Sequence, residues 1–133
     1  MLKISKILMT LLSLVPLFVF AQVISDPELP KATPPVQYSK EYSINAIKKV
    51  WGKDSEVGLT IAKCESSYNN LAVNYTDSQL NGHVSRGIFQ MSEINGVIPL
   101  WWEPKVNAEK AYQLYLKNGV RPWTNCALKL GLI

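Results

Sequence analysis

Residues 62–69 read Ala-Lys-Cys-Glu-Ser-Ser-Tyr-Asn, and the acidic residue among them, Glu65, stands at the end of an otherwise apolar helical pattern. The members of its helical face at i−8, i−4 and i−1 are Val57, Ile61 and Cys64. This pattern directs the Glu65 carboxylate toward the protein interior. Partial removal from water disfavours a charged carboxylate and raises its pKa, so that Glu65 can keep a proton near neutral pH and act as a general acid. The alternative is a surface Glu at a helix end.

Four later segments follow this stretch in the chain. The segments are Ser85-Arg-Gly-Ile-Phe-Gln-Met91, Glu103-Pro-Lys-Val-Asn107, Ala111-Tyr-Gln-Leu-Tyr115 and Gly119-Val-Arg-Pro-Trp-Thr124. Together and in this order, they resemble the transglycosylase SLT domain of the lysozyme-like superfamily, which contains the lytic transglycosylases and their hydrolytic relatives. The resemblance covers residues 42–126. It implies a mainly α, lysozyme-like α+β fold in one small domain, with a catalytic helix ending at Glu65 and a glycan-binding groove.

The resemblance also implies roles for individual residues. Glu65 is the expected catalytic acid and base, and the expected substrate-binding residues are Ser85, Gln90, Asn107 and Tyr115. The amide of Gln90 offers donors and an acceptor for an acetamido or hydroxyl group. A surface turn is the alternative for Gln90, and helix capping is the alternative for Asn107.

Several positions depart from the family pattern. Phe89 and Met91 differ from the commoner residues but stay apolar, and Glu103 replaces an Asp. Leu114 stands at the commonest family spacing for a Tyr that faces the catalytic Glu. Some relatives have an A-Y-Q-x-Y-like helix before G-x-x-P-W, and this resemblance implies Tyr115 as the tyrosine of the site. The tryptophans at 101, 102 and 123 have the flat faces that stack on sugars, but such aromatic residues also build protein cores.

Most glycosidases need a second carboxylate besides the general acid. No other acidic residue lies in a motif that places it opposite Glu65, and Asp77 is the best of the candidates. A lytic transglycosylase needs no such residue, because the C6 hydroxyl of the muramoyl sugar attacks and closes a 1,6-anhydro ring. The alternatives are a hydrolytic muramidase and an inactive peptidoglycan-binding or assembly module. The candidates are Asp54, Glu56, Asp77, Glu93 and Glu103.

The 133 residues leave room for one domain, and 47% hydrophobic against 18% charged residues excludes a disordered chain. Lys3 and Lys6 precede an apolar run over 7–20, which predicts a signal peptide over 1–21; an uncleaved membrane anchor is the alternative. Prolines concentrate within 26–35, so 22–40 is the expected linker and 41–133 the expected domain. The protein is therefore expected to be exported, as a periplasmic, wall-associated or secreted protein with no membrane span after cleavage.

The charge and the cysteine content of the chain limit the kinds of partner and of chemical site that it can have. Without Lys3 and Lys6, the 14 basic residues fall to 12 against 10 acidic ones, a net charge of +2 with no basic stripe for nucleic acid. Peptidoglycan glycan strands are the expected partner of a monomeric protein without cofactor. In an exported chain, the two cysteines, Cys64 and Cys126, predict a disulfide. A catalytic Cys64 would need His83, the single histidine, and one histidine with two distant cysteines makes no zinc site.

Glycine, proline and N-capping residues predict where the helices begin and end. Apolar spacing gives a helix over 43–51 that ends at Gly52, and Asp54 is the expected N-cap of the helix that carries Glu65. A further helix is expected to start at Pro104 rather than at Asn107 and to end at Gly119. Residues 69–85 lack periodicity and are expected to form a long loop or an irregular β-like excursion.

Overall fold

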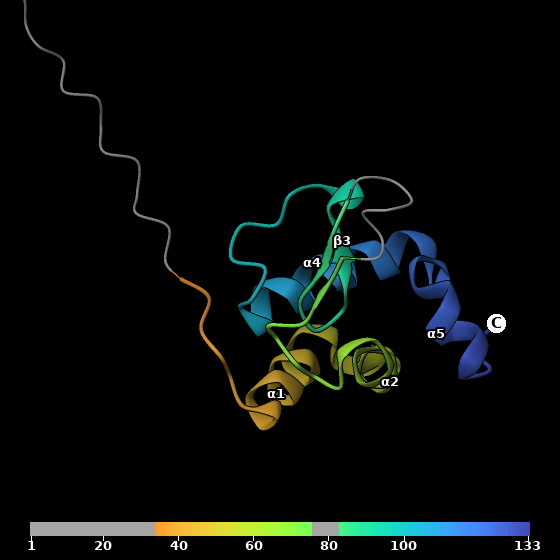
Figure 1. The fold of residues 1–133 in the computed structure, drawn as a ribbon. Coiled ribbons are helices and arrows are strands. Elements are labelled where there is room, and N and C mark those ends of the chain that lie inside the picture. Colours follow the sequence, from red (N-terminus) through yellow and green to blue (C-terminus); the bar gives the residue numbers. More distant parts are fainter. Residues whose placement is uncertain (1–33, 76–82) are drawn as a thin grey trace, which may run out of the picture. The chain divides into compact units, whose positions relative to one another are not determined.

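A computed structural model describes residues 34–75 and 83–133 (Figure 1). The predicted signal peptide, most of the predicted linker and Asp77 lie outside these residues. The described part is mainly helical with one small sheet, as the sequence predicts in outline. The helices are α1 (Lys40–Trp51), α2 (Ser55–Ser66), α4 (Pro104–Asn118) and α5 (Thr124–Lys129), with 3₁₀ turns η1 (Gly52–Asp54), η2 (Glu93–Asn95) and η3 (Arg121–Trp123); the strands are β1 (Val73–Asn74), β2 (Ser85–Arg86) and β3 (Met91–Ser92).

Helix α1 begins three residues before the predicted start because Ser39 caps it. The Ser39 hydroxyl accepts a hydrogen bond from the Tyr42 backbone N–H at 3.1 Å, which satisfies one of the N–H groups that a helix start leaves without a partner. The helix ends at Gly52, with φ of 51°. Its buried positions include Ile47 and Trp51, one turn apart, so the predicted amphipathic face is present.

The indole of Trp51 lies at the centre of the core. Its ring stacks on Phe89 with centroids 5.1 Å apart, and its Nε1–H donates to the Ala108 carbonyl at 3.2 Å. Gly58 lets α2 come against this ring, because a Cβ there would lie 2.6 Å from Trp51 Cδ2. The core therefore joins α1, α2, α4 and the segment after β2.

Asp54 stands at the N-cap position of α2, as predicted, but its side chain does not cap the helix. The side chain makes no capping hydrogen bond, and its backbone angles of −92° and 9° are not the extended ones that a capping side chain needs. These angles follow from the 3₁₀ turn η1, which ends at Asp54 directly before α2. The carboxylate instead accepts a hydrogen bond from the Tyr112 hydroxyl at 3.0 Å.

Helix α4 begins at Pro104, as predicted. Glu103 caps it by accepting a hydrogen bond from the Val106 N–H at 3.1 Å, and Gly119, with φ of 60°, follows its last turn. Asn107 is consequently inside the helix rather than its cap, so the capping alternative for Asn107 is wrong.

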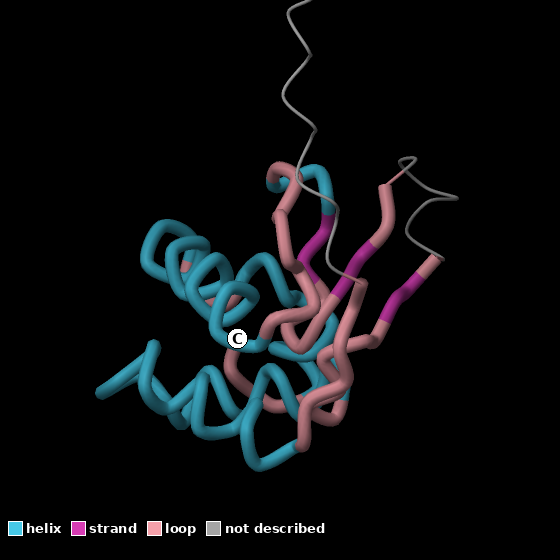
Figure 2. The backbone as a smooth tube through the Cα atoms, turned by 90° about the vertical axis from the view of Figure 1, so that its left-hand side faces the viewer, coloured by secondary structure: helices cyan, strands magenta, loops and turns pink. Residues whose placement is uncertain are grey.

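The three strands form one antiparallel sheet in the order β1-β2-β3. Val73 and Asn74 pair with Arg86 and Ser85, and Ser85 also pairs with Ser92. Each strand has two residues, and residues 87–90 form the tight connection between β2 and β3. Figure 2 shows the strands side by side, with helices packed on one side of them.

The last residues of the predicted linker already contact the folded domain. The side chain of Asn70, 1% exposed, donates to the Val36 carbonyl at 2.7 Å and accepts from the Tyr38 N–H at 3.0 Å. It also donates to the Trp102 carbonyl at 2.8 Å. This amide therefore ties the segment before α1 to the segment before α4.

Candidate active site

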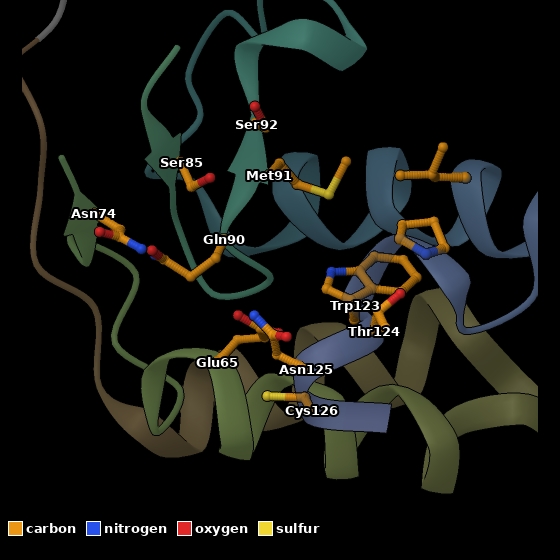
Figure 3. A pocket seen from close by; sticks show the side chains of 12 residues that line it. Glu65, Asn74, Ser85, Gln90, Met91, Ser92, Trp123, Thr124, Asn125 and Cys126 are labelled. Carbon is orange, nitrogen blue, oxygen red and sulfur yellow. The ribbon is translucent and has the colours of Figure 1, made fainter. Parts of the chain in front are cut away.

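A pocket of about 290 Å³ lies where the end of α2, the sheet and the start of α5 meet (Figure 3). Its walls combine hydroxyl and amide side chains with a smaller apolar part. Glu65 is the only carboxylate among the described residues that line it. The lining residues are Glu65, Asn74, Ser85, Gln90, Met91, Ser92, Leu114, Pro122, Trp123, Thr124, Asn125 and Cys126.

The sharp end of α2 places Glu65 at this pocket. Ser67 and Tyr68 both have left-handed backbone angles, with φ of 53° and 64°, and the Ser67 N–H donates to the Lys63 carbonyl at 3.0 Å. Two consecutive non-glycine residues in this region are uncommon and are found preferentially at functional sites. Because the chain turns away directly after Ser66, Glu65 lies on the last helical turn, half-buried at the pocket wall.

A row of three polar side chains crosses the sheet beside Glu65. Asn74, Ser85 and Ser92 are paired across β1, β2 and β3, and directly opposed residues place their side chains on the same face of a sheet. All three line the pocket (Figure 3). This row supplies amide and hydroxyl groups of the kind that bind sugars.

The connection between β2 and β3 is fixed by a dense set of hydrogen bonds. The Gly87 N–H donates to the Ala72 carbonyl at 2.9 Å, and the Ser66 hydroxyl donates to the Ile88 carbonyl at 2.8 Å. The Phe89 carbonyl accepts from the Trp123 indole at 2.8 Å. These bonds attach the turn to the residue before β1, to α2 and to η3, so its position relative to Glu65 is closely defined.

Gln90 is held in this turn by its own side chain. Its φ is 46°, and its Nε2 donates to the Ala72 and Gly87 carbonyls at 3.1 and 2.9 Å. The side chain extends toward Asn74 within the pocket (Figure 3). The two donor hydrogens are therefore used by the protein, and a ligand would meet mainly the acceptor side of this amide.

Asn107 lies behind the turn and does not line the pocket. It is 1% exposed; its Oδ1 accepts from the Phe89 N–H at 3.0 Å, and its Nδ2 donates to the Arg86 and Trp101 carbonyls at 3.3 and 3.1 Å. Gly87 makes room for it, because a Cβ there would be 2.2 Å from Asn107 Nδ2. Asn107 therefore supports the turn that carries Gln90.

Tyr115 also lies away from the pocket. Its ring packs 5.0 Å from Trp51 and 6.2 Å from Tyr112, in the partly buried edge of the core. Leu114 lines the pocket instead. The position where the resemblance leads us to expect a Tyr thus lines the pocket, although the residue there is a leucine.

The start of α5 forms a further wall of the pocket, and a disulfide joins α5 to α2. Cys64 and Cys126 are bonded, with Cα atoms 6.0 Å apart, which confirms the predicted pair and excludes a catalytic thiol at Cys64. Glu65 and Asn125 are the sequence neighbours of these cysteines, and both line the pocket. Figure 3 shows them entering it from α2 and α5. The disulfide therefore fixes the wall that contains Asn125 beside the expected acid.

The other acidic candidates among the described residues have partners elsewhere or are exposed. The carboxylate of Asp54 accepts from Tyr112, and this hydrogen bond is the main cause that raises the pKa of Tyr112. Glu93 pairs with Arg86 at 3.1 Å. Glu103 caps α4, and its charge is the main cause that raises the pKa of Tyr42. Glu56 is exposed on α2.

The tryptophans divide between core and surface. Trp123 is 4% exposed, with its ring 6.0 Å from Phe89, yet its edge contributes to the pocket. Trp101 and Trp102 pack edge to face, 5.7 Å apart, with the Arg86 guanidinium over Trp101. These two do not line the pocket.

Sequence reasoning missed several lining residues. Asn74, Ser92 and Asn125 belong to no motif and to no periodic face. Strand pairing and the disulfide bring these three residues close to Glu65. The disulfide could be predicted from the sequence, but the strand pairing could not.

Within the described residues, no group of three or more metal-ligating side chains is close enough to hold an ion, and no helix has the length and apolarity needed to cross a bilayer. Comparison with known proteins gives no match to a protein-family model, a curated protein or a solved structure.

Proposed function

We propose that the protein is an exported lytic transglycosylase with a lysozyme-like fold that cleaves the β-1,4 bond between N-acetylmuramic acid and N-acetylglucosamine in peptidoglycan. The observation that carries the proposal is the pocket itself. Glu65 stands at a helix end beside a row of amide and hydroxyl groups, and no other described carboxylate lines the same space. One acid with many neutral hydrogen-bonding groups suits a reaction in which the substrate supplies its own nucleophile.

In the proposed reaction, protonated Glu65 donates its proton to the glycosidic oxygen as the bond from that oxygen to C1 of the muramoyl sugar breaks. Positive charge develops at C1 and the ring oxygen. The Glu65 carboxylate then accepts the proton of the C6 hydroxyl of the same sugar, whose oxygen bonds to C1. A new non-reducing end and a 1,6-anhydro end result, Glu65 regains its proton, and no water is consumed.

The surrounding groups have clear tasks in this scheme. Asn74, Ser85 and Ser92 form a row that can bind hydroxyl and acetamido groups of one sugar. The acceptor side of Gln90 suits an N–H or O–H donor. Such groups hold the C6 hydroxyl close to C1, and this positioning is the larger part of what an intramolecular attack requires.

Hydrolysis is the second candidate. A muramidase would use Glu65 in the same way for the first step and would then activate a water molecule, for which Asp77 is the residue to test. The third candidate, an inactive binding module, would use the same pocket without turnover.

Mass spectrometry of the products from purified peptidoglycan distinguishes the three candidate functions. The oxidised protein is expected to release muropeptides that end in 1,6-anhydro-muramic acid. Reducing ends, each heavier by one water molecule, would replace this proposal with hydrolysis. Absence of products from folded, oxidised protein would favour the binding module.

A further inference from the structure

A second hollow lies beside the pocket, on α4. It measures about 110 Å³ and is lined by Met91, Lys110, Gln113, Leu114 and Lys117. Met91 and Leu114 also line the pocket of Glu65, so the two spaces share one boundary. A chain that leaves the pocket over these two apolar side chains arrives at α4.

The far side of this hollow is polar and positively charged. Lys110, Gln113 and Lys117 stand at i, i+3 and i+7 of α4, which is one face of the helix. We call these three residues the cationic shelf. Two ammonium groups and one amide on a single face can bind carboxylate oxygens from several directions.

The neighbouring charges leave the shelf positive. Of the acidic residues on α4, Glu109 is 3.6 Å from Lys105, to which it is paired, and no carboxylate lines the hollow. Among the described residues, neither Lys110 nor Lys117 has an ion-pair partner within 4.0 Å. A negatively charged ligand would therefore meet uncompensated positive charge beside the pocket.

We infer that the cationic shelf binds carboxylate groups of the polymer strand whose glycosidic bond lies at Glu65. This inference rests on the proposed function. Peptidoglycan carries free carboxylates on its stem peptides, and on those lactyl groups that bear no peptide, whereas a polymer of N-acetylglucosamine carries none. The shelf thus selects the anionic wall polymer over neutral glycans that would fit the same pocket.

The test compares two variants of equal charge. Lys110→Gln with Lys117→Gln removes both charges of the shelf. Lys48→Gln with Lys53→Gln removes two charges from exposed positions that line neither space. Each is assayed on solubilised peptidoglycan fragments and on the same fragments with their carboxylates amidated.

The shelf variant should lose about fivefold in kcat/KM on the native fragments, because it lacks two ion-pair contacts of modest strength at the protein surface, while the control pair stays near wild type. Rising salt should reduce this difference, because exposed charges are screened. On the amidated fragments the difference between the shelf variant and the wild type should close. Equal rates for the shelf variant and the control pair on native fragments would overturn the inference.

A binding measurement keeps this inference separate from the proposed reaction. If the wild-type protein releases no products, the proposed function fails. Calorimetric titration of the wild type and the shelf variant with native and amidated fragments then tests whether the cationic shelf binds carboxylates. Weaker binding of native fragments by the shelf variant alone would support it, and identical affinities would overturn it.

Discussion

Gly87→Ala is the most informative substitution for the turn that carries Gln90. A Cβ at this position would lie 2.2 Å from Asn107 Nδ2 and 2.8 Å from the Trp101 carbonyl oxygen. Real Cβ atoms do not approach other atoms so closely, and Trp101 O belongs to the backbone. Asn107 must therefore move or the turn must open.

The structure allows the cost to be worked out. Gly87 has φ of 78°, and an alanine in a left-handed conformation costs about 1 kcal/mol. Moving the Asn107 side chain breaks its hydrogen bonds to the Arg86 and Trp101 carbonyls and to the Phe89 N–H, and each buried group left without a partner costs about 1–3 kcal/mol. Together these predict a loss of at least about 4 kcal/mol in the free energy of unfolding.

Urea unfolding followed by far-UV circular dichroism measures this loss. Gly119→Ala is the control without a clash: Gly119 has φ of 60° and ψ of −141°, and nothing lies within 4 Å of the added Cβ, so it should lose only the cost of its backbone conformation, about 1–3 kcal/mol. In the double variant of Gly87→Ala with Asn107→Ala, the two losses should be less than additive, because one partner of the clash is gone. A Gly87→Ala protein as stable as the Gly119→Ala protein would refute the close packing of this turn.

Three further predictions concern the core and the disulfide. Ser43→Ala should stabilise the protein by about 1 kcal/mol, because the Ser43 hydroxyl is fully buried and finds no hydrogen-bond partner among the described residues; a lower urea midpoint would contradict this. Reducing the bond between Cys64 and Cys126, 62 positions apart, should cost about 4 kcal/mol in the chain-entropy treatment, and an unchanged midpoint in reductant would count against it. The hydrogen bond from Tyr112 to Asp54 raises the pKa of Tyr112, so its contribution is present below the ordinary tyrosine pKa of about 10 and is lost as pH rises through the higher folded-state value. The wild-type Tm should therefore fall more steeply above about pH 10 than that of Tyr112→Phe, and parallel curves would disprove this coupling.

The helical part of the fold could be predicted because local signals determine it. Ile47 and Trp51 mark the buried face of α1, Pro104 fixes the start of α4, and Gly52 and Gly119 follow helix ends. These residues act through backbone angles and spacing, which a sequence displays directly. The cap at Ser39 shows the limit, since it moved the start of α1 by three residues.

The sheet and its polar row could not be predicted in the same way. Strands of two residues have no alternating pattern, so nothing in the sequence shows that Asn74, Ser85 and Ser92 share one row. Their register depends on the turn at Gly87, and that turn depends on Asn107, which is far along the chain.

The structure brings some of the expected site residues together and not others. Glu65, Ser85 and Gln90 meet in one pocket, whereas Asn107 and Tyr115 lie in the interior behind it. The resemblance implied a ligand role for Asn107, but the hydrogen-bonding groups of its side chain are used by backbone groups that only the folded chain brings near. Tertiary contacts decide between such roles.

The central claim is that Glu65 supplies the proton, and its most direct test compares turnover of purified peptidoglycan by Glu65→Gln and Glu56→Gln. Both residues are on α2, but Glu56 is exposed and does not line the pocket. Glu65→Gln keeps the shape and removes the proton donor, so product release should fall by a factor of about 100 or more, while Glu56→Gln should remain near wild type. Full turnover by folded Glu65→Gln protein would contradict the account.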